Sequence, residues 1–342
     1  MTIREQLLDK INCKTKPIGA LGLLEEIALQ IGMIQQTTEP SIHRPHVIIF
    51  AADHGIATTG LVNPYPQAVT AQMVLNFLKG GAAINVFCRQ HDIILKIVDA
   101  GVNREWEQKH FHEDFISAKC GYGTNNYLER RAMSEEEAAY CIEQGRSIVS
   151  KYSSDCNCFG FGEMGISNTS SASLIMSSIL ELPIEDCIGR GTGTSDELLA
   201  TKIKTLQQVH SFHEIHLSKD KPLELLSKIG GFEIAMMTGA YLEAANNKKL
   251  IIVDGFISTA SLLIARLIDP SVRDYCLFAH RSGEQGHECM LRYFDARPIL
   301  DLGMRLGEGT GAALAIPLIR SAVHFLNDMA SFTSANVSVA SA

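Results

Sequence analysis

The residue best placed to do chemistry is Glu308, within the segment LDLGMRLGEGTGAALA (300–315). Gly307 and Gly309 flank this carboxylate, an apolar run precedes it and a helix-like apolar pattern follows it. This order predicts a strand-to-helix turn, which is where open α/β sheets bind ligands. Because glycine has no Cβ, a ligand can approach the carboxylate closely. Taken alone, the pattern also fits a sharp turn whose acid is favoured by the helix dipole.

Similar polar, glycine-rich segments follow other apolar runs. They are ADHG (52–55), GEMGISNTS (162–170), DGFISTAS (254–261) and AHRSGEQGH (279–287). If several of these segments meet at one sheet edge, they build a sizeable polar pocket. Glu163 lies in a G-E-x-G segment like that of Glu308, and two carboxylates near one ligand can divide acid and base roles. We expect Asp53 and Asp254 to hold hydroxyls or to cap loops.

Two loops have the composition of phosphate sites. Asn168 and Thr169 are expected to cap a helix after Gly165, and residues 191–195 precede a second helix. Backbone N–H groups at helix N-termini bind phosphate well. Lys202, about two turns into the second helix, would add a positive charge, although the position also suits a solvated surface lysine.

Neither loop matches the motifs of common nucleotide-binding proteins. The pattern G-x-x-x-x-G-K-[ST] of nucleotide triphosphatases is missing from both loops. Gly191 and Gly193 form a G-x-G that lacks a third glycine and a preceding strand. The sequence therefore disfavours a nucleotide triphosphatase and an NAD-dependent oxidoreductase.

No metal site is expected. His210, His213 and His216 recur every third residue of a helical stretch, but a spacing of six drifts off one helix face. Cys156 and Cys158 form C-x-C rather than C-x-x-C, which disfavours a zinc knuckle. The nine cysteines are odd in number and scattered, so a disulfide framework is not predicted either.

Six short, almost continuously apolar runs are typical of strands buried on both faces of a parallel sheet. They span 46–53, 93–101, 158–165, 250–256, 276–280 and 298–303. Helical patterns at 66–88, 134–150 and 194–209 separate most of the strands. The second helix begins with a capping box of Ser134 and Glu137, and Thr194 and Glu197 repeat that signature in the third. This alternation predicts a doubly wound, Rossmann-like α/β fold with a mostly parallel six-stranded sheet.

The two ends of the chain have a different pattern. Residues 1–40 are predicted to form helices with one apolar face, and residues 311–331 a long apolar helix. We expect both ends to pack together as a small helical subdomain of residues 1–40 and 311–342. The α/β catalytic domain would then be residues 41–310.

Composition narrows the class of protein. The chain has 342 residues, of which 46% are hydrophobic and 20% charged, which is ordinary for a globular protein. A net charge of -8 argues against the basic stripe that binds nucleic acid. The charged N-terminal segment has no signal core, and no apolar run reaches the ~20 residues of a membrane span. We therefore expect a cytoplasmic protein that binds neither nucleic acid nor membranes.

Taken together, the loops resemble those of the nicotinate-nucleotide–dimethylbenzimidazole phosphoribosyltransferase family. The resemblance covers essentially the whole chain, from KTKPIGALGLLE (14–25) and PYPQAVTAQMVLNFLKGGAAINVFCRQ (64–90) to MRLGEGTGAALA at its end. It includes ADHG, GEMGISNT, GRGTG, VDGFISTA and AHRSGEQGH in order. It implies transfer of phosphoribose from nicotinate mononucleotide to 5,6-dimethylbenzimidazole, giving α-ribazole 5′-phosphate and nicotinate in cobalamin lower-ligand synthesis.

The resemblance also implies roles for individual residues. Glu308 would be the general base that takes the N–H proton of the attacking ring, and Glu163 would lie close to the reacting ribose. The implied phosphate and ribose contacts are Gly165, Asn168, Thr169, Gly191, Gly193, Lys202, Asp254 and Ser282. The implied base-pocket residues are Gln72, Leu306, Asn63 and Tyr65. No metal or other cofactor is implied, because the leaving pyridinium departs as a neutral ring.

Several alternatives remain open. The acceptor could be adenine, another benzimidazole or a phenol, since family members and relatives differ in the base they accept. A phosphoribosyl pyrophosphate-dependent transferase is disfavoured, because such enzymes typically carry paired acids and Asp254 has no acidic neighbour. A non-catalytic nucleotide sensor would have no obvious need for Glu308. The resemblance further implies a homodimer.

Overall fold

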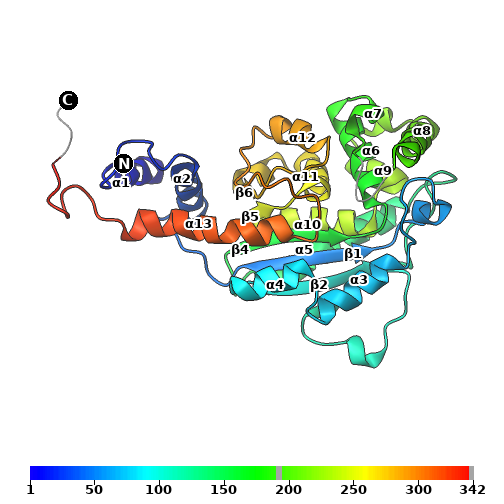
Figure 1. Cartoon of the computed structure of the whole chain (residues 1–342), viewed down its shortest axis with the longest axis horizontal. Coiled ribbons are helices and arrows are strands. Elements are labelled where there is room, and N and C mark those ends of the chain that lie inside the picture. The colour runs from blue at the N-terminus through cyan, green and yellow to red at the C-terminus, as the bar shows by residue number, and fades with distance from the viewer. Residues whose placement is uncertain (190–194, 339–342) are drawn as a thin grey trace.

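The computed structural model describes residues 1–189 and 195–338, and within them six parallel strands form a single sheet (Figure 1). The strand order is β3-β2-β1-β4-β5-β6. The strands are β1 (His46–Ala52), β2 (Ile94–Gly101), β3 (Phe115–Ser117), β4 (Cys158–Met164), β5 (Leu250–Val253) and β6 (Cys276–Phe278). The doubly wound α/β prediction is confirmed, and the sheet is parallel throughout rather than mostly parallel.

One predicted strand is wrong. Residues 298–303 form only an isolated parallel bridge between His280 and Leu300. The segment lies at the sheet edge and its Leu302 is 63% exposed, so its apolar run does not mark a buried strand. The missing strand is β3 at the opposite edge, where Phe115 pairs with Ile97. Its brevity and polar surroundings hide it from a search for apolar runs.

Helices cover both faces of the sheet. They are α1 (Ile3–Asn12), α2 (Leu23–Gln35), α3 (Val69–Leu78), α4 (Ala83–Gln90), α5 (Glu135–Tyr152), α6 (Asn168–Leu180), α7 (Ile184–Cys187), α8 (Asp196–His213), α9 (Pro222–Ile229), α10 (Phe232–Asn246), α11 (Phe256–Ile268), α12 (His287–Tyr293) and α13 (Thr310–Asp328). Among the described residues, no helix is both long enough and apolar enough to cross a bilayer.

The predicted helices are found with two adjustments, and a third helix begins as predicted. The pattern at 66–88 is two helices, α3 and α4, separated by a turn in which Gly80 has a φ of 77°. Helix α5 carries the predicted capping box, with Ser134 accepting from the Glu137 amide. Helix α8 is capped by Ser195, whose hydroxyl accepts from the Leu198 amide, and Thr194 lies outside the described residues.

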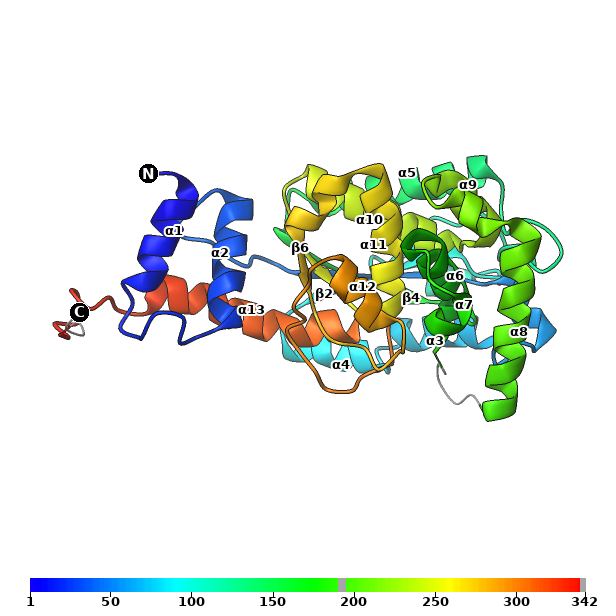
Figure 2. The same ribbon diagram turned by 90° about the horizontal axis from the view of Figure 1, so that it is seen from above.

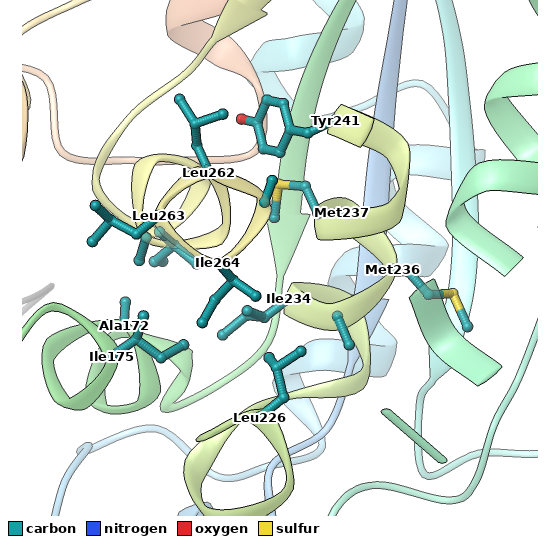
Figure 3. Packing of buried hydrophobic residues seen from close by; sticks show 14 of the residues in the cluster. Ala172, Ile175, Leu226, Ile234, Met236, Met237, Tyr241, Leu262, Leu263 and Ile264 are labelled. Atoms are coloured by element: carbon teal, nitrogen blue, oxygen red, sulfur yellow. The ribbon is translucent and has the colours of Figure 1, made fainter. Parts of the chain in front are cut away.

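Two hydrophobic cores flank the sheet, because successive strand side chains point to opposite faces. In β1, Ile48 and Phe50 join the core of α5, α6, α9, α10 and α11, whereas Val47 and Ile49 join the core of α3, α4 and α13. Figure 3 shows part of the first core, in which the side chains of α6, α9, α10 and α11 interdigitate. Helix α10 lies centrally on that face of the sheet.

The chain termini meet at one end of the molecule, where α1 and α2 lie beside the C-terminal half of α13 (Figure 2). The Thr15 amide donates to the Ala330 carbonyl at 3.0 Å, and the Phe332 amide donates to the Cys13 carbonyl at 3.0 Å. The other half of α13 packs on β4 and β5. The domain boundary at residue 310 stays a prediction, since one continuous helix contacts both parts.

Helices α5 and α10 approach each other at two glycines. A Cβ on Gly145 would lie 1.8 Å from the Met236 carbonyl oxygen, and one on Gly239 would lie 1.9 Å from the Ile142 carbonyl oxygen. Each glycine therefore allows the other helix's backbone into van der Waals contact. Helix α10 also packs against the sheet, so this close approach fixes the distance of α5 from α10 on that face of the sheet.

We expect Gly145→Ala to lower the free energy of unfolding by about 1–3 kcal/mol, because overpacking forces the helices apart. At an unconstrained helix position the same change would stabilise by up to about 1 kcal/mol, so the sign is diagnostic. Urea titration followed by circular dichroism measures the effect. Ser147→Ala, on the exposed side of α5, is the control and should be neutral or slightly stabilising. A neutral or stabilising Gly145→Ala would contradict the close approach.

Candidate active site

A cavity of about 350 Å³ opens at the carboxyl ends of the strands. The chain runs outward from β1 in both directions, to β2 on one side and to β4 on the other, which makes this the topological switch point of the sheet. The cavity is lined by Val62, Asn63, Tyr65, Val69, Met73, residues 163–169, Lys202, residues 254–258, His280, Ser282, Glu284 and residues 305–308. It contains the chemistry-bearing loops of several separate strands.

Most of the predicted site residues meet in this cavity. Those lining it are Asn63, Tyr65, Glu163, Gly165, Asn168, Thr169, Lys202, Asp254, Ser282, Leu306 and Glu308. Gln72 is exposed and lies outside the lining, to which α3 instead contributes Val69 and Met73. Gly191 and Gly193 lie outside the described residues.

Glu308 stands on a tightly constrained turn at the start of α13. Gly307, Glu308 and Gly309 all have left-handed backbone, with φ of 79°, 61° and 74°. Such a conformation is costly for a residue with a side chain, and non-glycine examples concentrate at functional sites. The turn also passes close to β4, where a Cβ on Gly162 would lie 2.3 Å from the Gly309 nitrogen.

Asp254, at the end of β5, holds this turn in place. Its carboxylate accepts from the Gly309 amide at 3.2 Å and from the Ala312 amide at 2.9 Å. Asp254 therefore caps α13, although it lies far from that helix in the sequence, and it satisfies N–H groups that the first turn of a helix leaves unpaired. The expectation that Asp254 caps a loop is confirmed.

The same holds for Asp53, at the end of β1. One of its oxygens accepts from the Asn103 amide at 2.7 Å. Beside it, the Nε2 atom of buried His54 lies 2.7 Å from a Glu233 carboxylate oxygen. None of these four residues lines the cavity. Their role is to hold the backbone that follows β1 in place.

The two buried glutamates both hold their protons more tightly than usual. Burial raises the pKa of Glu308 to about 7, and the charge of Asp254 adds to the effect. Burial also raises the pKa of Glu163 to about 8, against an opposing hydrogen bond from the Asn168 side-chain amide, while Glu233, Asp254 and Glu308 raise it further. Carboxyl groups that titrate near neutrality suit proton transfer.

The part of the cavity around Lys202 is suited to an anion. Lys202 is 2% exposed, and its ammonium group donates to the Thr169 hydroxyl at 3.2 Å. Burial lowers its pKa to about 8. Ser167, the N-cap of α6, has a buried hydroxyl with no hydrogen-bond partner in the described structure. A helix N-terminus, a buried cation and an unpaired hydroxyl together favour phosphate. The structure thus rejects the surface-lysine interpretation.

Sequence reasoning missed several lining residues. Val69 and Met73 are four residues apart on α3, a spacing that also fits ordinary core packing, so no signal separated them from the core. His280 was detectable, because it stands at the end of β6 within a segment already considered functional.

Comparisons with known proteins agree over nearly the whole chain. A family model described as "Phosphoribosyltransferase" matches residues 1–337. The nicotinate-nucleotide–dimethylbenzimidazole phosphoribosyltransferase of Cupriavidus taiwanensis is 52% identical, with 99% of this chain and 96% of the relative covered. The enzyme of the same name from Janthinobacterium sp. is 49% identical, covering 97% and 95%.

Solved structures show the same fold. The crystal structure of CobT from Thermus thermophilus superposes with a TM-score of 0.93 at 38% identity, covering 98% of this chain and 99% of that one. The shared fold and the identity of about half to curated relatives together establish the family of this chain. The chain belongs to the nicotinate-nucleotide–dimethylbenzimidazole phosphoribosyltransferase family.

Proposed function

We propose that this chain transfers the phosphoribosyl group of nicotinate mononucleotide to 5,6-dimethylbenzimidazole, releasing nicotinate and forming α-ribazole 5′-phosphate for cobalamin. The observation that carries the proposal is the cavity itself. A carboxylate whose pKa lies near neutrality, Glu308, stands in the same pocket as a buried anion site at Lys202. The curated relatives bear the name of this activity.

The chemistry follows from the positions of these groups. One benzimidazole nitrogen bonds to the anomeric carbon while the bond to the nicotinate nitrogen breaks. The bonding pair returns to the pyridinium nitrogen, and nicotinate leaves as a neutral pyridine ring. The acceptor ring would become cationic, so its remaining N–H proton passes to the Glu308 carboxylate. The leaving ring goes from cationic to neutral, so no negative charge develops on it that a metal would have to neutralise.

The cavity would also fix the position of the donor, nicotinate mononucleotide. Lys202 and the N-terminus of α6 would hold the 5′-phosphate, with Asn168 and Thr169 at that end. Glu163 accepts a hydrogen bond from the Asn168 side chain, and a Cβ on Gly307, next to Glu308, would lie 2.3 Å from its other oxygen. Its carboxyl would therefore face the ribose. The acceptor ring would lie against Met73, Tyr65 and Leu306 at the apolar mouth. We also propose that Gln72, Gly191 and Gly193 contact the substrates, as the resemblance to the family implies.

The homodimer implied by the resemblance is part of the proposal. Tyr65 and Leu306 line the cavity and are 44% and 51% exposed, and Leu302, four residues before Leu306, is 63% exposed. Exposed apolar side chains that cluster around a site favour contact with a partner. A second copy of the chain would cover them and shield the acceptor ring from water.

The direct test is an assay of nicotinate release and product mass from nicotinate mononucleotide and 5,6-dimethylbenzimidazole, with EDTA present. We expect turnover by the wild type, and a loss of about 10²–10⁴-fold in Glu308→Gln, because the general base is gone. Turnover retained in Glu308→Gln would overturn the base assignment alone. An inactive wild type that turns over with adenine or a phenol would change the acceptor. Tight nucleotide binding without product would favour the sensor alternative.

The pH dependence follows from the pKa of Glu308, about 7 in the free protein. Glu308 acts as a base only when deprotonated, so kcat/KM should fall about tenfold per pH unit below pH 7 and level off above it. Stopped or continuous assays between pH 5.5 and about 9 measure the profile, after correction for the acceptor's own protonation. A flat corrected profile across this range would contradict a base of raised pKa.

Lys202→Met should reduce kcat/KM for nicotinate mononucleotide about 100-fold or more, because a buried charge-assisted contact with phosphate costs about 3 kcal/mol to lose. The matched substrate is nicotinate riboside, which lacks the phosphate and should lose little between wild type and variant. Equal losses for the two donors would mean that Lys202 does not bind the phosphate.

A further inference from the structure

His280 is a buried histidine of the cavity wall for which the proposed mechanism has no use. It follows β6 directly and is 2% exposed. It lines the cavity next to Asp254 and Ser282. Its Nδ1 atom is buried with no hydrogen-bond partner in the described structure. Because Nδ1 is fully buried and no hydrogen bond of the described structure engages Nε2, Nε2 is the ring nitrogen left to meet a ligand in the cavity.

His287, seven residues further on, shows what a structural histidine looks like here. Its Nδ1 atom accepts from the Ser282 amide at 2.8 Å, and its Nε2 atom lies 3.0 Å from the Thr259 hydroxyl. Both ring nitrogens are used, so the tautomer is fixed with the proton on Nε2. The two rings lie 6.2 Å apart, yet only His280 is left unpaired.

The Nε2 edge of His280 faces the Asp254 carboxylate across a small gap. A Cβ on Gly311 would lie 2.8 Å from His280 Nε2 and 2.8 Å from Asp254 Oδ1, so these two atoms lie within twice that distance of each other. They form no direct ion pair in the described structure, which leaves a separation that one oxygen atom could bridge. Gly255 keeps the near side of the gap open, since a Cβ there would lie 3.1 Å from Nε2.

The gap has one donor and one acceptor. An imidazole N–H donates, and Nε2 is the ring nitrogen that faces Asp254. The carboxylate only accepts, and it has lone pairs left beyond those used by Gly309 and Ala312. A hydroxyl both donates and accepts, so it matches the two partners at once. An anionic group could accept from His280 only, and the Asp254 carboxylate, which already accepts from two backbone amides, would have no donor to bond.

We propose that His280 and Asp254 together bind a ribose hydroxyl of the donor, and that His280 thereby makes the enzyme selective for ribosyl over deoxyribosyl donors. The ribose is the part of the donor that lies between the phosphate at Lys202 and the anomeric carbon near Glu308. This inference rests on the proposed function, because it takes the ribose position from it. The shared hydroxyl would also hold the sugar ring in a fixed orientation for displacement.

The test compares three donors: nicotinate mononucleotide and its 2′-deoxy and 3′-deoxy analogues. The wild type should prefer the ribose donor over one of the analogues by about 10–100-fold in kcat/KM, since a site built to bond a hydroxyl rejects the analogue that lacks it. In His280→Ala the ribose donor should lose about as much, whereas that analogue should lose less than about 3-fold. The substrate and protein changes thus form a double-mutant cycle, whose coupling is the measurement.

Two further variants sharpen the assignment. His280→Gln places an amide nitrogen near the position of Nε2 and should recover part of the ribose preference, whereas His280→Asn places it near Nδ1 and should not. His324→Ala changes an exposed histidine paired with Asp328 on α13 and should leave all three donors unaffected. Thermal unfolding of each variant shows whether it is folded.

The outcomes separate the two proposals. A role in folding alone would lower kcat/KM for every donor equally in His280→Ala and leave the preference unchanged, which would overturn the inference. A wild type that turns over all three donors equally would overturn it as well. A wild type that is inactive with nicotinate mononucleotide and every acceptor would instead overturn the proposed function.

Discussion

The bond between the Asp254 carboxylate and the first turn of α13 is the contact on which the site depends. It joins the end of β5 to the Gly309 and Ala312 amides, and so fixes the left-handed turn that carries Glu308. Side-chain capping from a distant strand replaces the local cap that the sequence GEGTG does not provide. Without it, the cost of the left-handed Glu308 would favour a relaxed turn, with the carboxylate out of the cavity.

Helix α13 transmits this constraint to the rest of the molecule. Its first half packs on β4 and β5, and its second half packs on α2. The terminal segments are further tied by hydrogen bonds around Thr15 and Phe332. Helix α13 therefore connects the helices at the two ends of the chain to the turn that carries Glu308. In the described structure these terminal helices contribute no residue to the cavity.

The sequence was most informative where one physical cause dominated. Buried parallel strands gave five of the six strands as continuous apolar runs, and strand-end loops located Glu163, Asp254 and Glu308 in one cavity. Edge elements were the failures: β3 is too short to show a pattern, and residues 298–303 are apolar without being a strand. Side-chain placement was also out of reach, since nothing in the sequence marks Met73 of α3 as a residue that lines the cavity. The family resemblance supplied the reaction, which no spacing could provide.

The two buried carboxyl groups of the cavity, Glu163 and Glu308, connect the stability of the protein to the charge of its donor. Burial raises the pKa of both Glu163 and Glu308, so the folded protein binds their protons more tightly than the unfolded chain does. Their contribution to stability is therefore complete at low pH and is lost as the pH rises through about 7 for Glu308 and about 8 for Glu163. The donor brings a pyridinium cation and a ribose carbon that becomes more positive as the bond breaks. In a site shielded from water, ionised carboxylates are stabilised by that charge and stabilise it in turn. An interaction of this kind strengthens as positive charge develops on the ribose carbon, and only interactions that are stronger in the transition state accelerate the reaction.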